Sequence, residues 1–498
     1  MNKSPIVKGA VISYVSIFLN IAISFFYTPW MIRQIGVSDY GLYSLVISFI
    51  SYFIMDFGLS KAISRFISKY RAEGNEEGVA NMIGITTRVY LLIDTIIFVV
   101  LFILFFFITN IFKGLTPQET EKLKVLYCIA GSFSVLNFMF KPMDGAMMAF
   151  EYFVENKLLD MVQKVGTVLL ICMALVFGVG VYALVLINGA VALIVSVSKF
   201  LVFKYKSKLI IHWRYFDRKE LKDIFSFSVW AFGRGMAQRL RFSLVPTVLG
   251  VFCNSTEISF FALGMTLEGM VYTIANAING LFLPKVSRLS HSNDRDAIMD
   301  LMIRVGRIEL YIITLIYTGF IIFGQAFLQL WVGAEFSKVY YILIFLITAN
   351  LVTLTEDIAE NLVFVENQIR YTTSIILACS LAGLIGSCLC SSRFGAVGCA
   401  FCSGAALCLD VLIVNVFYYK KMQLDIPRFF KECHLKILPV LVILAGLAFV
   451  VKDYAQLNSW LKLVLNALLY CVVFVIVAYV AVFNKEEKQL VKSIIKHK

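Results

Sequence analysis

An apolar window of about 20 residues recurs along the whole chain, and this is the length that a helix needs to cross the hydrocarbon core of a bilayer. The windows fall at about 10–32, 41–60, 84–108, 125–148, 158–178, 182–203, 224–250, 258–283, 306–328, 340–363, 371–391, 396–419, 435–451 and 462–483. The first is too long for the apolar region of a signal peptide and has no small-residue cleavage site, so we expect it to be retained as a span.

The composition indicates the same class of protein. Of the 498 residues, 60% are apolar and only 15% are charged. Soluble domains carry about 25% charged residues, so an ordinary soluble protein is excluded. We therefore predict an all-α polytopic membrane protein with about 14 transmembrane helices.

Lysine and arginine predict the orientation of these helices. With a cytoplasmic N-terminus, 31 of the 45 basic residues fall in cytoplasmic segments and eight in external loops, by count along the sequence. Because cytoplasmic loops carry the excess of basic residues, both termini and the basic segment 204–222 are expected in the cytoplasm. Such segments often rest on anionic membrane lipids, and we expect no nucleic-acid partner.

Cysteine and histidine predict no metal site. Six of the eleven cysteines crowd the eleventh and twelfth windows, where a thiol serves as a small apolar packing residue. A disulfide near the outer ends of these helices, for instance between Cys390 and Cys399, is the alternative. The four histidines have no ligand spacing, so neither a metal nor another cofactor is expected.

Three short matches indicate an internal repeat. They are "FVENKL" (153–158) with "FVENQI" (364–369), "KAISRF" (61–66) with "PKVSRL" (284–289), and Pro29 with Pro246. The members of each pair lie six windows apart, which predicts two six-helix bundles in parallel orientation and a peripheral C-terminal helix pair.

The repeat divides the chain into four parts. We expect an N-terminal six-helix bundle at 1–203, a basic cytoplasmic linker at 204–222, and a C-terminal six-helix bundle at 223–420. A helix pair and a basic tail would follow at 421–498. In transporters built from such repeats the substrate binds between the halves.

Six of the 45 basic residues are counted with neither a cytoplasmic segment nor an external loop and lie inside the windows: Arg88, Lys141, Lys164, Arg234, Arg239 and Arg241. A charge at the bilayer centre costs about 2.5–3.5 kcal/mol on insertion scales, so three arginines in one helix need an explanation. At 100° per residue, Arg234, Gln238 and Arg241 share one helical face, whereas Arg239 points about 140° away from Arg234.

Structural roles compete with a functional one. An intramembrane arginine can pair with an acid of a neighbouring helix, for which Glu268, Asp94 and Asp56 are candidates. It can also extend to the interface, which suits Arg88 near a cytoplasmic helix end but not Arg241 midway along its window.

The two intramembrane lysines have local acids at ion-pair spacing. Lys141 lies three residues before Asp144, and Lys164 lies four residues after Asp160. For both lysines we expect a structural ion pair.

Acidic residues inside the windows are candidates for carrying a coupling proton or sodium ion. Glu268 lies on a polar face of the eighth window, and Asp94 is isolated in the apolar third window. Glu356, Glu360 and Asp410 are further acids in later windows. An intramembrane carboxylate is a functional hypothesis by default, although each of these could merely neutralise an arginine.

The stretch 32–70 resembles a known family, the polysaccharide-biosynthesis flippases of the multidrug/oligosaccharidyl-lipid/polysaccharide exporter superfamily. The resemblance is carried by "GVSDYGLYSL" (36–45), by "DFGLSKAISRF" (56–66) and by the recurrence "EISFFALG" (257–264). The chain length, the fourteen windows and the repeat agree with this family.

The resemblance implies that the chain moves an oligosaccharide linked to polyprenyl pyrophosphate, such as an O-antigen or capsule repeat unit. Movement would run from the cytoplasmic to the outer leaflet of a bacterial inner membrane. A V-shaped cavity between the bundles would hold the headgroup, and alternating access would carry it across the membrane. A polysaccharide polymerase and assembly proteins are the expected partners.

The arginines acquire a role from this substrate. Arginine binds phosphate through a bidentate fork and stays charged when partly dehydrated. We therefore predict that Arg234, Gln238 and Arg241 contact the pyrophosphate, with Arg239 and Arg88 as further candidates.

Three other functions are weighed against this one. A lipid II flippase would share the cationic cavity, whereas a multidrug antiporter would recognise cations with acids and aromatic rings and typically has twelve spans. A membrane glycosyltransferase or polymerase would need a metal-binding acidic motif or a large external catalytic loop. The longest external loop, 109–124, has no catalytic cluster, so we expect no enzyme.

Overall fold

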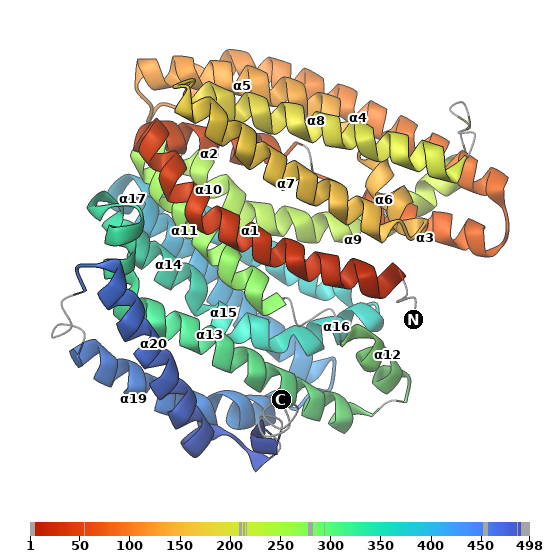
Figure 1. Ribbon diagram of the computed structural model, residues 1–498. Helices are drawn as coiled ribbons and strands as arrows, with labels where there is room; N and C mark the ends of the chain where they lie inside the picture. Colours follow the sequence, from red (N-terminus) through yellow and green to blue (C-terminus); the bar gives the residue numbers. More distant parts are fainter. Residues whose placement is uncertain are drawn as a thin grey trace. The chain divides into compact units, whose positions relative to one another are not determined.

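The computed structural model describes residues 5–53, 55–208, 212, 215, 217–276, 282–292, 294–451, 457–485 and 487–489 (Figure 1). Every regular element in these ranges is a helix, as expected for an all-α membrane protein. The chain forms two compact units, one made of 1–262 with 376–399 and the other of 263–375 with 400–498. These limits differ from the expected bundles at 1–203 and 223–420, which stay a prediction.

The first unit holds the helices from α1 to α10 and the start of α11. Their bounds are α1 Pro5–Ile35, α2 Val37–Ser51, α3 Leu59–Ala72, α4 Glu76–Ile111, α5 Pro117–Phe138, α6 Pro142–Ala149, α7 Phe153–Val176, α8 Val181–Ser207, α9 Arg218–Gln238, the π-helical turn η1 Arg239–Ser243, α10 Leu244–Phe252 and α11 Ser255–Asn276.

The second unit holds the rest of α11 and most of the later helices. Their bounds are α12 Leu283–His291, α13 Arg295–Trp331, the 3₁₀ turn η3 Ala334–Ser337, α14 Lys338–Thr348, α15 Asn350–Thr353, the 3₁₀ turn η4 Leu354–Glu356, α16 Asp357–Val365, α17 Ile369–Lys420, α18 Ile426–Phe429, the π turn η5 Phe430–His434, α19 Leu435–Val451, α20 Trp460–Val477 and the π turn η7 Ala478–Val482.

Each of the fourteen apolar windows has a helical segment within the described ranges. Among these residues, eight helical segments are long and apolar enough to cross a membrane, judged by length and composition. The count is lower than fourteen partly because the windows 371–391 and 396–419 both fall in α17.

Helix α17 folds back on itself at Gly395, where φ is 56° and ψ is −142°. The Cys399 thiol lies 3.7 Å from the Ser387 carbonyl oxygen, which it contacts as a donor. Twelve residues of straight helix would separate these positions by about 18 Å. Glu257 caps the turn, because its carboxylate accepts a hydrogen bond from the Ala396 amide at 2.8 Å.

The second apolar window, 41–60, is not one continuous span. Helix α2 ends at Ser51 and α3 begins at Leu59, and both Phe57 (φ 51°) and Gly58 (φ 73°) have left-handed backbone conformations between them. A hydropathy window does not detect this break, because its residues are mostly apolar.

Helix α4 presents large apolar side chains outward. Leu92 is 67% exposed and Phe106 65% exposed, on the same helix that buries Ile97 and Leu101. An exposed apolar face of this extent would be unfavourable in water but is suited to contact with lipid tails. The helix thus fits the membrane environment expected from the sequence.

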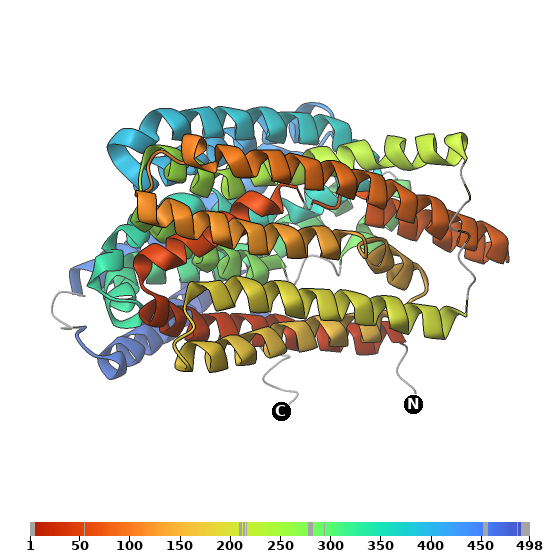
Figure 2. The same ribbon diagram turned by 90° about the horizontal axis from the view of Figure 1, so that it is seen from above.

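In the first unit the long helices lie alongside one another. Helix α7 packs against α1 and α8, and α8 also packs against α5 (Figures 1 and 2). The short helix α6 lies against α3, where Gly145 has no room for a side chain because a Cβ atom would lie 2.5 Å from the carbonyl oxygen of Ser60.

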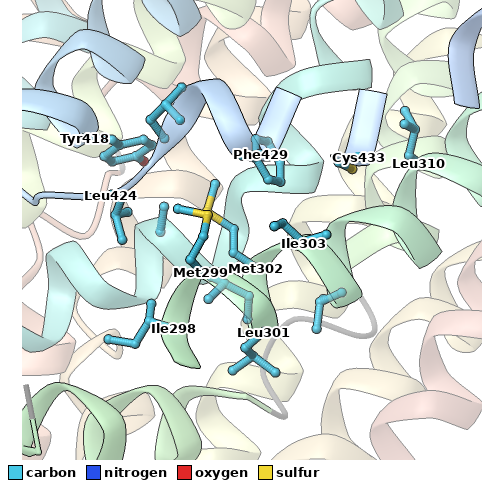
Figure 3. Packing of buried hydrophobic residues seen from close by; sticks show 14 of the residues in the cluster. Ile298, Met299, Leu301, Met302, Ile303, Leu310, Tyr418, Leu424, Phe429 and Cys433 are labelled. Atoms are coloured by element: carbon cyan, nitrogen blue, oxygen red, sulfur yellow. The ribbon is translucent and has the colours of Figure 1, made fainter. Parts of the chain in front are cut away.

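In the second unit the core forms around α13. Met299 and Met302 of α13 are almost fully buried, and Phe429 and Cys433 from the α18–η5 segment belong to the same cluster (Figure 3). Burial of this cluster attaches the segment that precedes α19 to the central helix of the unit.

Candidate functional site

The arginine-rich stretch forms the junction of α9, η1 and α10 in the first unit. Its five central residues, Arg239–Ser243, form a π-helical turn, in which the Leu244 amide donates to the Arg239 carbonyl oxygen five residues earlier. Single π turns inside α-helices are rare and are frequent at functional sites. Two of the three arginines therefore lie in the irregular part of the helix.

The arginines differ in burial. Arg241 is buried, with 9% of its surface exposed, whereas Arg234 and Arg239 are half-buried and Gln238 is exposed. Arg234 and Gln238 both lie in α9, so the four-residue spacing places them on one face of a regular α-helix. Arg241 lies in the π turn, where that spacing no longer gives the direction of a side chain. The shared face of all three residues therefore stays a prediction, since it assumes a regular α-helix.

The break between α2 and α3 packs against this stretch. The Tyr52 hydroxyl donates to the Ser243 carbonyl oxygen of the π turn and lies 3.0 Å from the Thr247 hydroxyl. Phe57 stacks on Phe232 of α9, with ring centroids 5.1 Å apart. These contacts position the arginine-bearing turn through residues that the sequence analysis did not single out.

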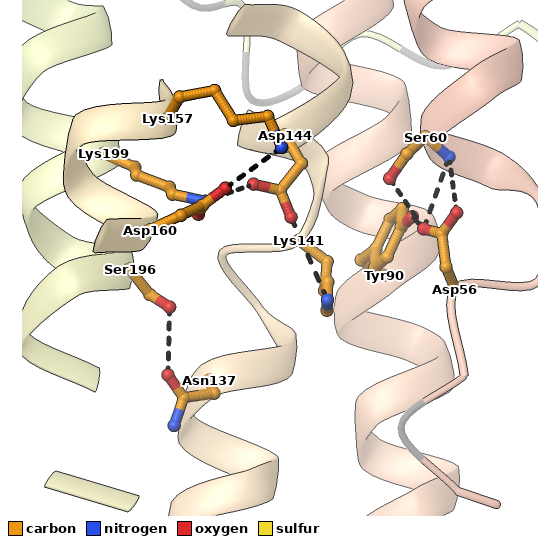
Figure 4. Close-up of polar contacts among 10 residues, drawn as sticks. All are labelled: Asp56, Ser60, Tyr90, Asn137, Lys141, Asp144, Lys157, Asp160, Ser196 and Lys199. Carbon is orange, nitrogen blue, oxygen red and sulfur yellow. Dashed lines mark hydrogen bonds and ion pairs between the residues drawn. The ribbon is translucent and has the colours of Figure 1, made fainter. Parts of the chain in front are cut away.

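Asp56, considered as a partner for the arginines, has other partners. It accepts hydrogen bonds from the Tyr90 hydroxyl at 2.6 Å and from the Ser60 hydroxyl at 2.7 Å (Figure 4). It also accepts from the Ser60 amide at 3.3 Å, so it caps the first turn of α3. The role of Asp56 is therefore to fix the break that contacts η1.

Arg88 and Asp94 both lie on α4. Arg88 is half-buried, while Asp94 is 8% exposed. One buried carboxylate oxygen of Asp94 has no hydrogen-bond partner in the part of the chain that the structure describes. A buried carboxylate in this state is costly when charged, which is compatible with a site that takes up a proton.

Glu268 lies on α11 in the second unit and is half-buried. Its carboxylate accepts a hydrogen bond from the side-chain amide of Asn350 in α15 at 2.9 Å. The two candidate ion-coupling residues, Asp94 and Glu268, thus belong to different units. Their role in coupling stays a prediction.

The two local lysine pairs have different outcomes. Lys141 lies 3.9 Å from Asp144, which agrees with the expected ion pair. The expected pair of Lys164 with Asp160 is wrong, because Asp160 instead contacts Lys199 at 2.8 Å and Lys157 at 3.6 Å. Asp160 thus pairs with lysines of α8 and of its own first helical turns in place of Lys164.

A polar cluster around Lys199 was missed at the sequence level. Its ammonium group donates to Asp144 at 2.9 Å and to Asp160 at 2.8 Å, so α6, α7 and α8 meet at one ion network (Figure 4). The signal was weak because Lys199 lies at the end of its window and resembles a topogenic flank.

Acids of the second unit form another set of buried polar groups. Glu309 of α13 is 1% exposed, and neither of its carboxylate oxygens has a hydrogen-bond partner among the residues described. Glu356 is 4% exposed and accepts from the Asn415 amide at 2.6 Å. Glu356 was expected as an intramembrane acid, whereas Glu309, close to the start of its window, was not.

Metal ligands do not assemble in the described residues. No group of three or more His, Cys, Asp or Glu side chains there has an arrangement that could hold a metal ion. All eleven cysteines are free thiols, including Cys390 and Cys399. The chemistry that the sites offer is therefore that of guanidinium, ammonium, carboxylate and amide groups.

Comparison with known proteins identifies the family. A family model described as "Polysaccharide biosynthesis protein" matches residues 6–290, so the chain belongs to this family, as the sequence resemblance predicted. No curated protein matches the chain.

Solved structures of transporters share the fold. A lipid II flippase MurJ in an inward closed conformation has a TM-score of 0.74 at 14% identity, covering 95% of this chain and 99% of that one. An inward-facing multidrug resistance MATE family transporter of the MOP superfamily has a TM-score of 0.69 at 13% identity, covering 86% and 99%. At these identities the likeness establishes the fold alone, and with it the predicted fold class is confirmed.

Proposed function

We propose that this chain is a flippase for an oligosaccharide linked to polyprenyl pyrophosphate, the repeat unit of a surface polysaccharide. It moves the headgroup from the cytoplasmic to the outer leaflet of a bacterial inner membrane by alternating access. Family membership and the flippase-like fold support this class of activity.

The observation that carries the proposal is the arginine-bearing π turn inside the apolar window 224–250. Arg241 is 9% exposed, and Arg234 and Arg239 lie within two turns of it. A pyrophosphate needs compensating charge wherever water is excluded, and arginine supplies both charge and bidentate hydrogen bonds. Arg234, Gln238 and Arg241 are the proposed pyrophosphate contacts, with Arg239 and Arg88 as secondary ones.

Coupling to a proton or sodium gradient is part of the proposal. Glu268 and Asp94 are the proposed carriers, because each is a carboxylate inside an apolar helix. Glu268 is half-buried, and one of its oxygens accepts a hydrogen bond from Asn350.

Lipid II is the second candidate substrate. The likeness to a lipid II flippase extends over 95% of this chain, and such a flippase would be expected to share a cationic cavity. The family description, which concerns polysaccharide biosynthesis, favours the surface-polysaccharide substrate.

The location of the accumulating intermediate tests the proposal. In cells that lack the chain, lipid-linked repeat units should accumulate on the cytoplasmic leaflet, where a glycosidase added outside spheroplasts cannot reach them. Restoring the chain should expose them to the enzyme. Accumulation of lipid II in place of repeat units would favour the second candidate, and accumulation of neither would contradict both.

A further inference from the structure

The first unit contains a polar cavity of about 510 Å³ that the arginine site does not include. Residues of α2, α5, α6, α7 and α8 line it, so it is formed where these five helices meet. Its volume falls within the roughly 300–1,000 Å³ of small-molecule binding pockets. Along α8 the lining runs from Val185 to Lys199, about 21 Å of helix.

Amides and hydroxyls dominate the polar lining. They are Ser134, Asn137, Asn156, Gln163, Asn188 and Ser196. Each amide offers both donors and an acceptor, which is the mixture that sugar hydroxyls require. Phe133 and Phe140 add apolar walls.

The charges that line the cavity cancel. Lys199 is held between Asp144 and Asp160, and Lys141 lies 3.9 Å from Asp144 (Figure 4). An anion would meet two carboxylates and a cation would meet two ammonium groups. The lining therefore favours a neutral polar ligand.

One lining acceptor is not satisfied by the protein. The side-chain oxygen of Asn156 is buried and has no hydrogen-bond partner among the described residues. By contrast, Asn137 accepts from Ser196 at 3.0 Å and donates to the Phe133 carbonyl at 2.8 Å. A buried acceptor without a partner is costly, and a hydroxyl donor from a ligand would remove that cost.

The cavity lies close to the arginine-bearing turn. Ile47 of α2 lines the cavity, whereas Tyr52 at the end of the same helix contacts Ser243 of η1. These two positions are about 8 Å apart along the helix axis. At 100° per residue the two positions also face directions about 140° apart, so α2 contacts the cavity on one side and η1 on the other.

We infer that this cavity binds the carbohydrate part of the lipid-linked substrate, as a neutral hydroxyl-rich ligand, through Asn156 and Gln163 of α7 among others. The inference rests on the proposed function and assigns the glycan a site separate from that of the pyrophosphate. Discrimination between glycans would then reside in the first unit.

Binding to two lipids tests the inference. The purified full chain in nanodiscs is titrated with bare polyprenyl pyrophosphate and with the lipid-linked glycan pool extracted from cells that lack the chain. The wild type should bind the glycan-bearing lipid about tenfold tighter or more, the effect of one or two good hydrogen bonds. Asn156→Leu with Gln163→Leu should reduce this ratio to about two or less, with binding of the bare lipid unchanged.

Controls separate the glycan site from folding and from the pyrophosphate site. Val162→Leu changes a neighbouring side chain of α7 that is 60% exposed, so it should keep the wild-type ratio. Arg241→Ala should weaken binding of both lipids equally. Thermal unfolding is measured for the double variant and for each single substitution. It identifies any loss of lipid binding that is caused by misfolding.

The outcomes are distinct. If the double variant keeps the wild-type ratio, or if the folded wild type binds both lipids equally, the cavity is not the glycan site, while the proposed function survives. If the wild type binds neither lipid, the proposed function fails and this inference fails with it.

Discussion

Arg307 of α13 and Glu487, which follows η7 in the chain, form a bidentate ion pair with distances of 2.6 Å from Nε to Oε1 and 2.9 Å from Nη2 to Oε2. The two residues are 4% and 8% exposed. The guanidinium also donates to the carbonyl oxygens of Glu432 at 2.8 Å and Val482 at 3.0 Å. One side chain thus joins the central helix of the second unit to both ends of its C-terminal helix pair.

Breaking this pair should destabilise the second unit. Glu487→Gln leaves a buried guanidinium without its counter-charge, and loss of one partner of a buried pair costs roughly 3–5 kcal/mol. We expect a lower thermal unfolding midpoint of the purified protein. The matched control is Asp300→Asn, which breaks the exposed pair with Arg428 and should cost about 1 kcal/mol or less. Equal midpoints for the two variants would contradict the assignment.

The arginines of α9 and η1 should be needed for export. Arg234→Ala and Arg241→Ala are expected to abolish or severely reduce surface polysaccharide in a complemented deletion strain, with normal membrane levels of the protein. Arg241→Lys should be partly active, because lysine keeps the charge but loses the bidentate geometry. Arg241→Glu should be inactive, and Arg239→Ala should be milder. Wild-type export by both alanine variants would mean that the arginines are structural.

Glu268 should determine the dependence on an ion gradient. Glu268→Gln removes the ionisable group but keeps a partner for Asn350, so substrate binding should be largely retained. Transport in vesicles with an imposed proton or sodium gradient should lose its response. Glu335→Gln, at an exposed acid of η3, is the control that should respond like the wild type. A preserved response in Glu268→Gln would leave this acid with a structural role only.

Gly395 should not tolerate a side chain. Its backbone lies in a region that only glycine readily adopts, and a Cβ atom would overlap the carboxylate of Glu257. Gly395→Ala is expected to cost about 1–3 kcal/mol or more and to lower the unfolding midpoint. Gly166→Ala, in α7 with no atom within 4 Å of the added Cβ, should be neutral or slightly stabilising.

The orientation can be tested with single cysteines. In a background without the eleven native thiols, His212→Cys should react with an impermeant maleimide only after cells are opened, because the basic segment around it is expected in the cytoplasm. Glu121→Cys, at a side chain that is 74% exposed in a segment expected outside, should react in intact cells. The reverse pattern would invert the predicted topology.

The sequence predicts where helices form better than how they are interrupted. Apolar windows identify the spans, because a bilayer core requires a run of apolar residues irrespective of their neighbours. The break at Tyr52–Gly58 escapes this reasoning, since Phe53, Met55 and Phe57 are as apolar as a continuous span would be. The π turn at Arg239–Ser243 escapes it as well, because it changes the hydrogen-bond register and leaves the hydropathy unchanged.

Pairings between distant segments were also beyond the sequence. Arg307 and Glu487 are separated by 180 positions, and each alone resembles a residue at a cytoplasmic helix end. Nothing in the sequence around Lys199 indicates its partners, because Asp144 and Asp160 lie on two other helices, α6 and α7. Which acid meets which base depends on helix packing, so of the two local pairs expected for the intramembrane lysines only Lys141–Asp144 forms.

The π turn lets the arginine-bearing helix hold one residue more than a regular α-helix would. Five residues close the turn from Arg239 to Leu244, where four would close it in an α-helix. Removing one residue, for instance Leu240, would let the i→i−4 ladder run through while Arg234 kept nearly the same direction relative to Pro246. A one-residue insertion in an ancestral α-helix is accordingly a simple route by which this segment could gain a residue while α10 kept its packing against α2.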